Sequence, residues 1–139
     1  MRKIIYRGKV RYNGNHLFQG DWVTGSLIVK PIGTFIYVIE KDELGNIVMD
    51  YAVEVMPETI GLYSGQLSRN EKEICEGDIL RFEDEQVSVV RWADGGLVVD
   101  ADFGDYDTTV LGWAIDALGD CEIIGNITDN PELLKPTAK

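Results

Sequence analysis

The sequence predicts a mainly β protein, and three observations lead to that prediction. Short apolar runs rich in β-branched and aromatic residues recur along the 139 residues, as in "TFIYVIEK" at 34–41. Gly, Asn, Asp and Pro bound these runs, which is typical of strands joined by turns. Apolar positions recur with the period of two that strands require rather than the 3.6 of helices. With 45% hydrophobic residues, the chain suits one domain or two small halves that share a core.

The first half contains the longer apolar runs. In "TFIYVIE", Phe35, Tyr37 and Ile39 alternate with Ile36 and Val38, so both faces of the strand are apolar. A strand that is apolar on both faces is expected in the middle of a sheet. Strands are expected within 3–12, 14–30, 34–41 and 47–55, with a turn at "DELGN", 42–46.

The second half repeats the pattern at shorter spacing, which is the density expected of a small barrel or a strongly curled sheet. The turn "ADGG", 93–96, supplies the glycine that a tight hairpin needs at positive φ. Segment 112–119 fits either a strand or a short helix. The end "DNPELL" predicts one helical turn with Asn130 as N-cap and Pro131 at the first helical position. Strands are expected within 78–82, 86–92, 96–103, 109–115 and 121–127.

The two halves meet at a candidate linker. Residues 56–73 gather Pro, Gly, Ser and charged residues, which are typical of connecting segments. We therefore expect a β-rich N-terminal region at 1–60 and a barrel region with a short C-terminal helical turn at 61–139.

Charge is distributed unevenly along the chain. The net charge is −11; residues 1–60 hold seven Lys/Arg and seven Asp/Glu, whereas residues 61–139 hold six and seventeen. Such a surface repels phosphates, so nucleic acid is not the expected partner. The exception is a basic strip of five residues, which could contact a phosphate backbone or the acidic half of this protein or a neighbouring copy; the net field favours the second. The strip comprises Arg2, Lys3, Arg7, Lys9 and Arg11.

No apolar run approaches the ~18 residues that a membrane span needs, and the start of the chain lacks the pattern of a leader. We expect a soluble, cytoplasmic protein. Its two cysteines, Cys75 and Cys121, are then expected to be reduced and partly buried.

The stretch "ICEGDILRF", 74–82, places Cys75, Glu76 and Asp78 beside Gly77. Acidic neighbours raise the pKa of a thiol, which disfavours a reactive cysteine. The set also lacks a histidine or a second cysteine to complete a zinc site. The favoured interpretation is a turn in which Gly77 takes an unusual backbone angle and Asp78 caps neighbouring amides before a strand begins.

Four aspartates lie close together in the acidic loop 100–107: Asp100, Asp102, Asp105 and Asp107. Oxygen ligands at this density suggest calcium, but the spacing of the helix-loop-helix calcium motif is absent. An irregular calcium or magnesium site, an anionic contact surface and a solvated loop all stay open.

The remaining chemical signals are isolated. His16, the one histidine, sits in a polar turn, where an exposed loop residue is the default and a general acid or base role is the alternative. No glycine-rich phosphate motif is present. The tryptophans at 22, 92 and 113 adjoin strand patterns, which favours a place in the core over stacking with bases. We therefore predict no catalytic, cofactor-binding or metal-binding residues.

Several phrases together resemble one family. The phrases "IIYRGKV", "GDWVTGSLIV", "PETIGLYSGQLSRNEKEICEGDILRF", "VVRWADGG" and "CEIIGNITDNPELL" are similar to the YopX proteins of bacteriophages and prophages. The resemblance implies a mainly β protein with an SH3-like barrel in its C-terminal half, and no established biochemical activity. The family tends to have an aromatic residue where Cys75 stands, and an Asn-Gly turn where this chain has Asn70-Glu71. We expect a packing role for Cys75 and a different turn at 69–72.

These observations favour a non-enzymatic, phage- or prophage-encoded binding or assembly protein. It would act in the host cytoplasm through a protein partner or as a homo-oligomer. One alternative is an acidic mimic of DNA that occupies a host protein's DNA-binding groove. Another is an enzyme, which the missing nucleophile-base pair and metal set disfavour.

Overall fold

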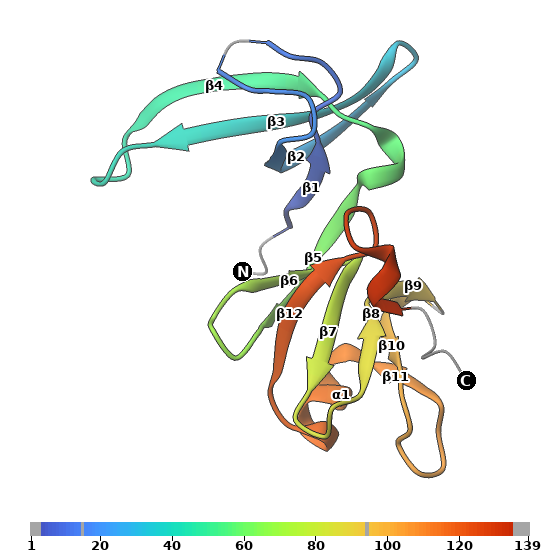
Figure 1. Ribbon diagram of the computed structural model, residues 1–139. Coiled ribbons are helices and arrows are strands. Elements are labelled where there is room, and N and C mark those ends of the chain that lie inside the picture. Colours follow the sequence, from blue (N-terminus) through green and yellow to red (C-terminus); the bar gives the residue numbers. More distant parts are fainter. Residues whose placement is uncertain (1–3, 15, 94, 135–139) are drawn as a thin grey trace. The chain divides into compact units, whose positions relative to one another are not determined.

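The structure is a computed structural model that describes residues 4–14, 16–93 and 95–134. It confirms a mainly β fold, and the chain divides into two compact units, Met1–Leu62 and Tyr63–Lys139 (Figure 1). The first unit contains β1 (Tyr6–Lys9), β2 (Trp22–Lys30), β3 (Gly33–Lys41), β4 (Ile47–Glu54) and the 3₁₀ helix η1 (Pro57–Thr59), and β5 (Gly61–Leu67) begins there. The second unit contains β6 (Glu73–Cys75), β7 (Asp78–Phe82), β8 (Val87–Val89), β9 (Arg91–Ala93), β10 (Gly96–Asp100), β11 (Thr108–Val110), α1 (Leu111–Leu118), β12 (Cys121–Asn126) and the 3₁₀ helix η2 (Pro131–Leu134).

The first unit is an antiparallel sheet in the order β4-β3-β2-β1, followed by the start of β5. The sheet curls back on itself at one end, because Val10 forms a bridge with Val55 and the Arg11 N–H donates to the Glu54 carbonyl at 3.0 Å. The curled face encloses a small core of Val10, Val23, Ile36 and Val55, with Leu17, Val38, Val53 and Ile60 packed around it.

A glycine allows β2 to leave β3 at this curl. The pairing of β2 with β3 runs from Ser26↔Tyr37 to Lys30↔Gly33, and the preceding residues of β2 pair with β1 instead. A Cβ on Gly25 would lie 2.9 Å from the carbonyl carbon of Tyr37 and closer still to its oxygen. Only glycine permits two backbones to approach this closely.

The expected central position of strand 34–41 is confirmed for its first part only. β3 pairs with both β2 and β4 up to Tyr37, whereas Val38 to Lys41 pair with β4 alone among the described strands. The far part of the β3–β4 hairpin is therefore two-stranded.

The second unit surrounds one core with two three-stranded sheets, β12-β7-β8 and β11-β10-β9, while the later part of β5 pairs with β6. The expected strand 86–92 is divided at Val90, whose N–H donates to the Asp78 carbonyl. β12 returns to pair with β7, which joins the end of this unit to its beginning. The SH3-like form of the barrel stays a prediction. The core comprises Ile74, Leu80, Phe82, Val90, Val99, Leu111, Ala114 and Cys121.

Helical segments settle two open points. Segment 112–119 is helical and not a strand, since α1 buries Leu111 and Ala114 in the core. The expected helical turn near the C-terminus is η2. Pro131 is its first residue, as expected, and Asn130 holds the N-cap position. The Asn130 side chain, however, accepts the Asn126 N–H at 3.2 Å and thereby ties the turn back to β12.

The boundary between the two units, at Leu62 and Tyr63, falls within the candidate linker 56–73, but most of this segment is ordered structure rather than loop. It contains η1, all of β5 and the first residue of β6. Gly65 takes a φ of 87°, and the β5–β6 register shifts between Tyr63 and Leu67. The polar, glycine-containing composition thus belongs to an irregular strand.

Candidate protein-interaction surface

The turn predicted at "EGD" is present, because the chain turns at Glu76 and Gly77 between β6 and β7. Gly77 has a φ of 94°, a conformation that favours glycine. Asp78 is 2% exposed, and its Oδ2 accepts the Cys75 N–H at 2.8 Å. A buried carboxylate that accepts a backbone donor holds the chain in position where β7 begins. Cys75 and Asp78, which first suggested reactivity, therefore have structural roles.

Among the described residues, neither Cys75 nor Cys121 forms a disulfide, and both are buried. Burial, together with the negative charge of Asp120, raises the pKa of the Cys121 thiol to about 11. A thiol with so high a pKa is almost entirely protonated at neutral pH, so it is a poor nucleophile.

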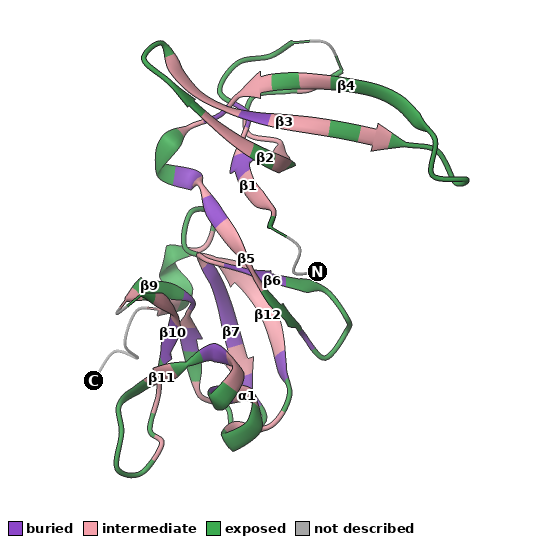
Figure 2. Ribbon diagram, turned by 180° about the vertical axis from the view of Figure 1, so that it is seen from behind, coloured by how far each residue is buried: buried purple, intermediate pink, exposed green. Residues whose placement is uncertain are grey.

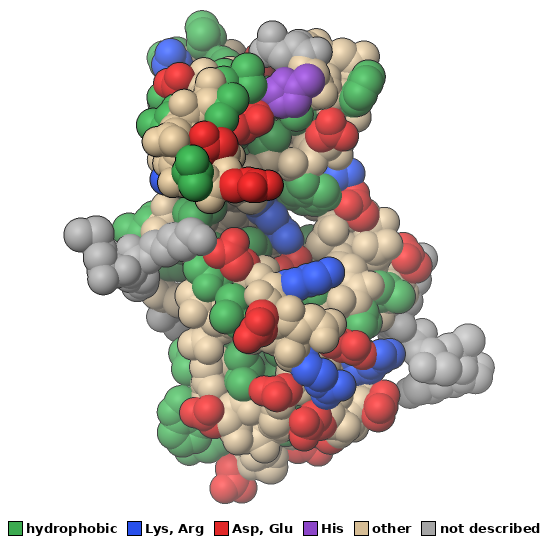
Figure 3. All heavy atoms as spheres, turned by 90° about the vertical axis from the view of Figure 1, so that its left-hand side faces the viewer, with side chains coloured by type: hydrophobic (Ala, Val, Ile, Leu, Met, Phe, Trp, Pro, Cys, Tyr) green, Lys and Arg blue, Asp and Glu red, His purple; other side chains and the backbone are tan. Residues whose placement is uncertain are grey.

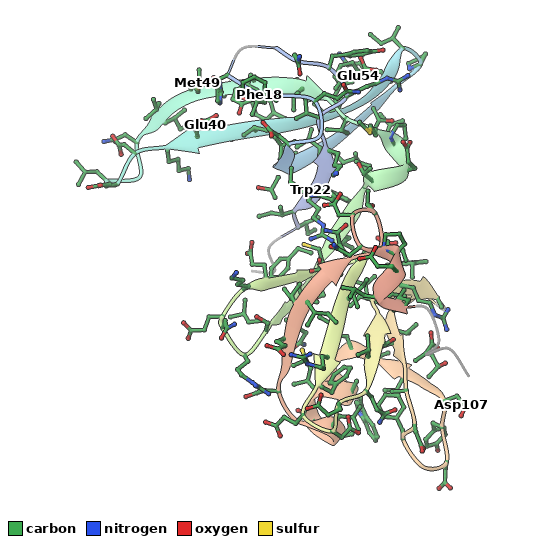
Figure 4. The ribbon with its side chains drawn as sticks, in the orientation of Figure 1. Phe18, Trp22, Glu40, Met49, Glu54 and Asp107 are labelled. Atoms are coloured by element: carbon green, nitrogen blue, oxygen red, sulfur yellow. The ribbon has the colours of Figure 1, made fainter. Side chains whose placement is uncertain are left out.

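The acidic loop is held mainly by hydrogen bonds with residues outside it. The Arg91 guanidinium donates to Asp100 from Nε at 2.7 Å and from Nη2 at 2.8 Å, and the Thr108 hydroxyl donates to Asp100 at 2.6 Å. The hydrogen bonds from Arg91 are the main reason that the pKa of Asp100 falls to about 2. Asp102 accepts the Gly104 N–H at 2.9 Å, while Asp107 lies at the loop between β10 and β11 (Figure 4). Within residues 4–14, 16–93 and 95–134, no group of three or more His, Cys, Asp or Glu could hold a metal ion.

His16 joins a polar cluster on the first unit. Its Nε2 lies 3.0 Å from Glu40 Oε2, and the Tyr51 hydroxyl donates to the same oxygen at 2.5 Å. The His16 and Tyr51 rings also meet edge to face, with centroids 5.6 Å apart. The hydrogen bond from Tyr51 lowers the pKa of Glu40, and burial together with Glu40 raises the pKa of Tyr51 to about 12.

This cluster fastens the loop between β1 and β2 to the β3–β4 hairpin. Its partners are 24 and 11 residues apart in sequence, so no local motif could reveal them. The Tyr51 hydroxyl stays protonated at neutral pH because its pKa is raised, so no phenolate is present to act as a base. Within the described part of the chain, the side chains of His16, Glu40 and Tyr51 hydrogen-bond to one another and to no Ser, Thr or Cys hydroxyl or thiol that a base could activate.

The expected core role of the tryptophans is wrong for two of them. Trp92 and Trp113 are exposed, whereas Trp22 is half-buried. Trp92 lies on the three-residue strand β9 at the edge of its sheet. Trp113 lies on α1 between Leu111 and Ala114, which face the core, and therefore points to the other side of the helix.

The basic strip makes contacts inside the first unit. Arg7 and Lys9 lie over the Trp22 ring, 4.9 and 5.5 Å from its centroid. Arg11 donates to the Tyr12 hydroxyl at 3.1 Å and lies 3.8 Å from Glu54. Arg2 and Lys3 lie outside the described residues.

Exposed apolar residues gather on the far part of the β3–β4 hairpin, residues 39–50, which we call the hairpin arm. Every residue from 41 to 50 is exposed (Figure 2). Leu44 is 88% exposed and Val48 66% exposed. Ile39, Ile47 and Met49 add to this apolar surface.

The arm is also acidic. It holds four carboxylates, Glu40, Asp42, Glu43 and Asp50, and one lysine, Lys41. Figure 3, which views the molecule from the side on which the tip of the hairpin lies in Figure 1, shows acidic and hydrophobic side chains next to one another near the single histidine. Figure 4 places Met49 and Glu40 on the two neighbouring strands of the arm, where they are register partners.

The sequence contained a signal for this surface. "IVM", 47–49, is an unbroken apolar run in a segment that follows a polar turn, and Leu44 lies within that turn. Three successive apolar residues in a strand cannot all face one core, because neighbouring side chains alternate in direction. An exposed run of this kind is unfavourable unless it has a function.

These features define a class: a two-unit β protein with structural cysteines and a solvent-exposed, apolar and acidic hairpin. The family comparison is consistent with that class, since a family model described as YopX protein matches residues 6–135. The chain belongs to the YopX family. No curated protein was found to match it significantly. Among the described residues, no helix is long and apolar enough to cross a membrane.

Proposed function

We propose that this YopX protein is a non-enzymatic binding or assembly module that acts through protein–protein contacts, with the hairpin arm as its contact surface. The main support for this proposal is that apolar residues are exposed on both faces of the arm. The setting that fits the family resemblance is a phage or prophage gene whose product works in the cytoplasm of the bacterial host.

The hairpin arm is energetically unfavourable in water by itself. A two-stranded hairpin without a packed face is marginally stable in water, and a surface that gathers apolar residues generally serves an interaction. The arm residues beyond Glu40 bury little, yet they include Leu44, Ile47, Val48 and Met49. Solubility alone would favour polar residues at these positions.

The size of the surface suits a transient contact. Burial of one large aliphatic side chain contributes roughly 1.5–3 kcal/mol, so four such residues contribute on the order of 6–12 kcal/mol. Association costs an estimated 4–15 kcal/mol of lost freedom. The net free energy of association is therefore that of a weak contact, unless backbone hydrogen bonds or charges strengthen it.

The polar clusters support a non-enzymatic protein. The His16 cluster is exposed and includes a tyrosine whose pKa is raised. Asp100 pairs with Arg91, and Glu122 pairs with Arg81. Their hydrogen bonds lie within the protein, and each group stabilises its own unit.

A site-specific photo-cross-linker tests the proposal. The residue p-benzoylphenylalanine would replace Val48 in one protein and Asp107 in a control, and both would be irradiated in bacterial cells that express them. Both positions are exposed, and they lie on different units. We expect a discrete adduct of higher mass from Val48 and none of the same mass from Asp107.

Two outcomes contradict the proposal. If Val48 gives no discrete adduct at any expression level, the arm is not a contact surface. If Asp107 alone gives an adduct, and that adduct contains a DNA-binding protein, the acidic-mimic alternative replaces the present one.

A further inference from the structure

We propose that the outer edge of β4 takes up an extended segment of a partner protein as an added β-strand, and that this segment alternates cationic and apolar residues. This inference rests on the proposed function, because it specifies how the hairpin arm makes its contact. It draws on the backbone direction of β4, the charge of the arm and the division of side chains between its two faces.

The backbone of β4 presents hydrogen-bonding groups on its outer side. The Val55 N–H donates inward to the Thr34 carbonyl of β3, whereas the Glu54 carbonyl accepts from Arg11 on the opposite side. Residues in an antiparallel strand alternate between the two directions. The N–H and C=O of Ala52 and Asp50 therefore point outward, away from β3.

No described strand covers these outward groups. β4 is the last strand of its sheet. Among the described residues, the backbone of Arg11 contacts the edge at Glu54, and His16 contacts Tyr51 and Glu40 through their side chains. An uncovered edge of this kind is the template on which strand addition occurs.

The edge carries limited protection against added strands. Natural edge strands are commonly blocked by lysine, proline or a bulge. β4 contains neither lysine nor proline. Its register with β3 shifts beyond Met49, since Glu40 pairs with Met49 and Lys41 pairs with Ile47. The regular part of the edge from Asp50 to Val53 is therefore the part suited to pairing.

The negative charge of the hairpin arm determines which kind of strand can bind beside β4. The arm has four carboxylates against one lysine, and Glu54 adds another carboxylate to β4. Hydrogen bonds from Tyr51 and from the backbone of Asn46 lower the pKa values of Glu40 and Asp42, so both stay ionised at neutral pH. A second copy's β4 would bring the same negative charges to the edge, and like charges across a strand pair are destabilising. A cationic segment is attracted instead.

The chain's own basic strand is not the occupant. β1 pairs with β2 along Tyr6 to Lys9 and with β5 at Tyr6 and Arg7. Its backbone is already engaged on both sides, so it cannot serve a neighbouring copy without unfolding. The occupant is therefore a segment of a different protein.

The two faces of β4 specify the alternation. Asp50, Ala52 and Glu54 share one face, and Met49, Tyr51 and Val53 share the other, because side chains alternate along a strand. The first face carries two carboxylates and the second carries apolar and aromatic groups. A strand laid beside β4 extends both faces, so its cationic residues belong on the first and its apolar residues on the second.

The experiment uses the full chain, labelled with ¹⁵N, and the peptide acetyl-KVKVTVKV-amide. Matched controls are the acidic peptide acetyl-EVEVTVEV-amide and two versions of the cationic peptide that are N-methylated at alternate positions in opposite phases. An added strand directs alternate N–H groups toward β4. Methylation of the N–H groups that face β4 should thus abolish binding, whereas methylation of the N–H groups that face away should leave the affinity within about twofold.

The expected protein response is local. The amide resonances of Asp50 and Ala52 should shift most, and their hydrogen exchange should slow at least tenfold when the peptide is saturating. The acidic peptide should bind at least tenfold more weakly. Raising the salt from 0.05 to 0.5 M should weaken the cationic peptide severalfold.

Two protein variants complete the test. Ala52→Pro removes an outward N–H without removing a β3 hydrogen bond, so it should weaken binding at least tenfold while β3 and β4 stay folded. Glu43→Lys should weaken binding about two- to fivefold, whereas Glu85→Lys, the same charge change at an exposed residue of the second unit, should have no effect. If Ala52→Pro does not fold, the two methylation phases still decide the question.

Three outcomes overturn the inference. They are no binding of the cationic peptide at 1 mM, equal effects of the two methylation phases, and equal binding of the acidic peptide. These outcomes are distinct from failure of the proposed function. A Val48 adduct without peptide binding would keep the arm as a contact surface and reject strand addition alone.

Discussion

Replacement of Gly25 by any larger residue should strongly destabilise the first unit. A Cβ built on Gly25 would lie 2.9 Å from the carbonyl carbon of Tyr37, and ordinary contact begins at 3.4 Å. The two backbones would therefore have to separate by at least about 0.5 Å. The obstacle is backbone rather than a mobile side chain, so rotation of a side chain cannot relieve it.

The expected cost of Gly25→Ala is about 3 kcal/mol, the upper part of the range for overpacking. A unit of 62 residues has a stability of roughly 3–9 kcal/mol at the usual value per residue. The substitution therefore removes a large share of that stability. It should raise the unfolded fraction of the first unit about a hundredfold, since 1.4 kcal/mol corresponds to a factor of about ten.

Hydrogen–deuterium exchange read by mass spectrometry checks this prediction unit by unit. Peptides from 22–41 should exchange much faster in Gly25→Ala, whereas peptides from 78–99 should change little. Gly14→Ala is the matched control, because a Cβ on Gly14 meets nothing within 4 Å. Exchange in 22–41 that is the same for both variants would refute the reasoning about close approach.

The remaining predictions concern the second unit. Glu71 has a φ of 62°, so Glu71→Gly should stabilise the protein by about 1 kcal/mol, and an unchanged or lower urea midpoint would contradict this. Asp100 has a pKa of about 2 in the folded protein, below the value of about 3.9 in the unfolded chain. Its contribution to the free energy of unfolding is therefore complete above about pH 4 and is lost as the pH falls toward 2. Because the side chain is 47% exposed, Asp100→Asn should cost no more than about 1 kcal/mol at neutral pH and nothing measurable near pH 2; a constant difference in melting temperature across this range would count against the Arg91 pairing. Gly77→Val should lower the melting temperature more than Cys75→Ser, because valine is strained at a φ of 94°, and comparable melting temperatures would reject that account.

Local chemistry was predictable where a few neighbouring residues decide it. Gly77 and Gly95 have positive φ values of 94° and 82°, as their turns required. The buried Asp78 accepts the Cys75 N–H three residues away. Apolar patterns located most strands because alternation is a property of the strand itself.

Features that depend on distant partners were not predictable in the same way. The contact of His16 with Glu40 and Tyr51 joins a loop to a hairpin only after β2, β3 and β4 have paired. Trp92 and Trp113 lie in apolar segments, but the edge position of β9 and the outward side of α1 leave both exposed.

The sequence by itself determined the β class, the family, the principal turns and the structural role of "ICEGDILRF". Only the tertiary structure decided that β3 and β4 continue beyond β2 as an exposed arm, and that the outer edge of β4 points its backbone groups away from the sheet. The physical reason is that alternation fixes the direction of each side chain, whereas a neighbouring strand or a core, brought near by folding, decides whether that direction is buried or open to a partner.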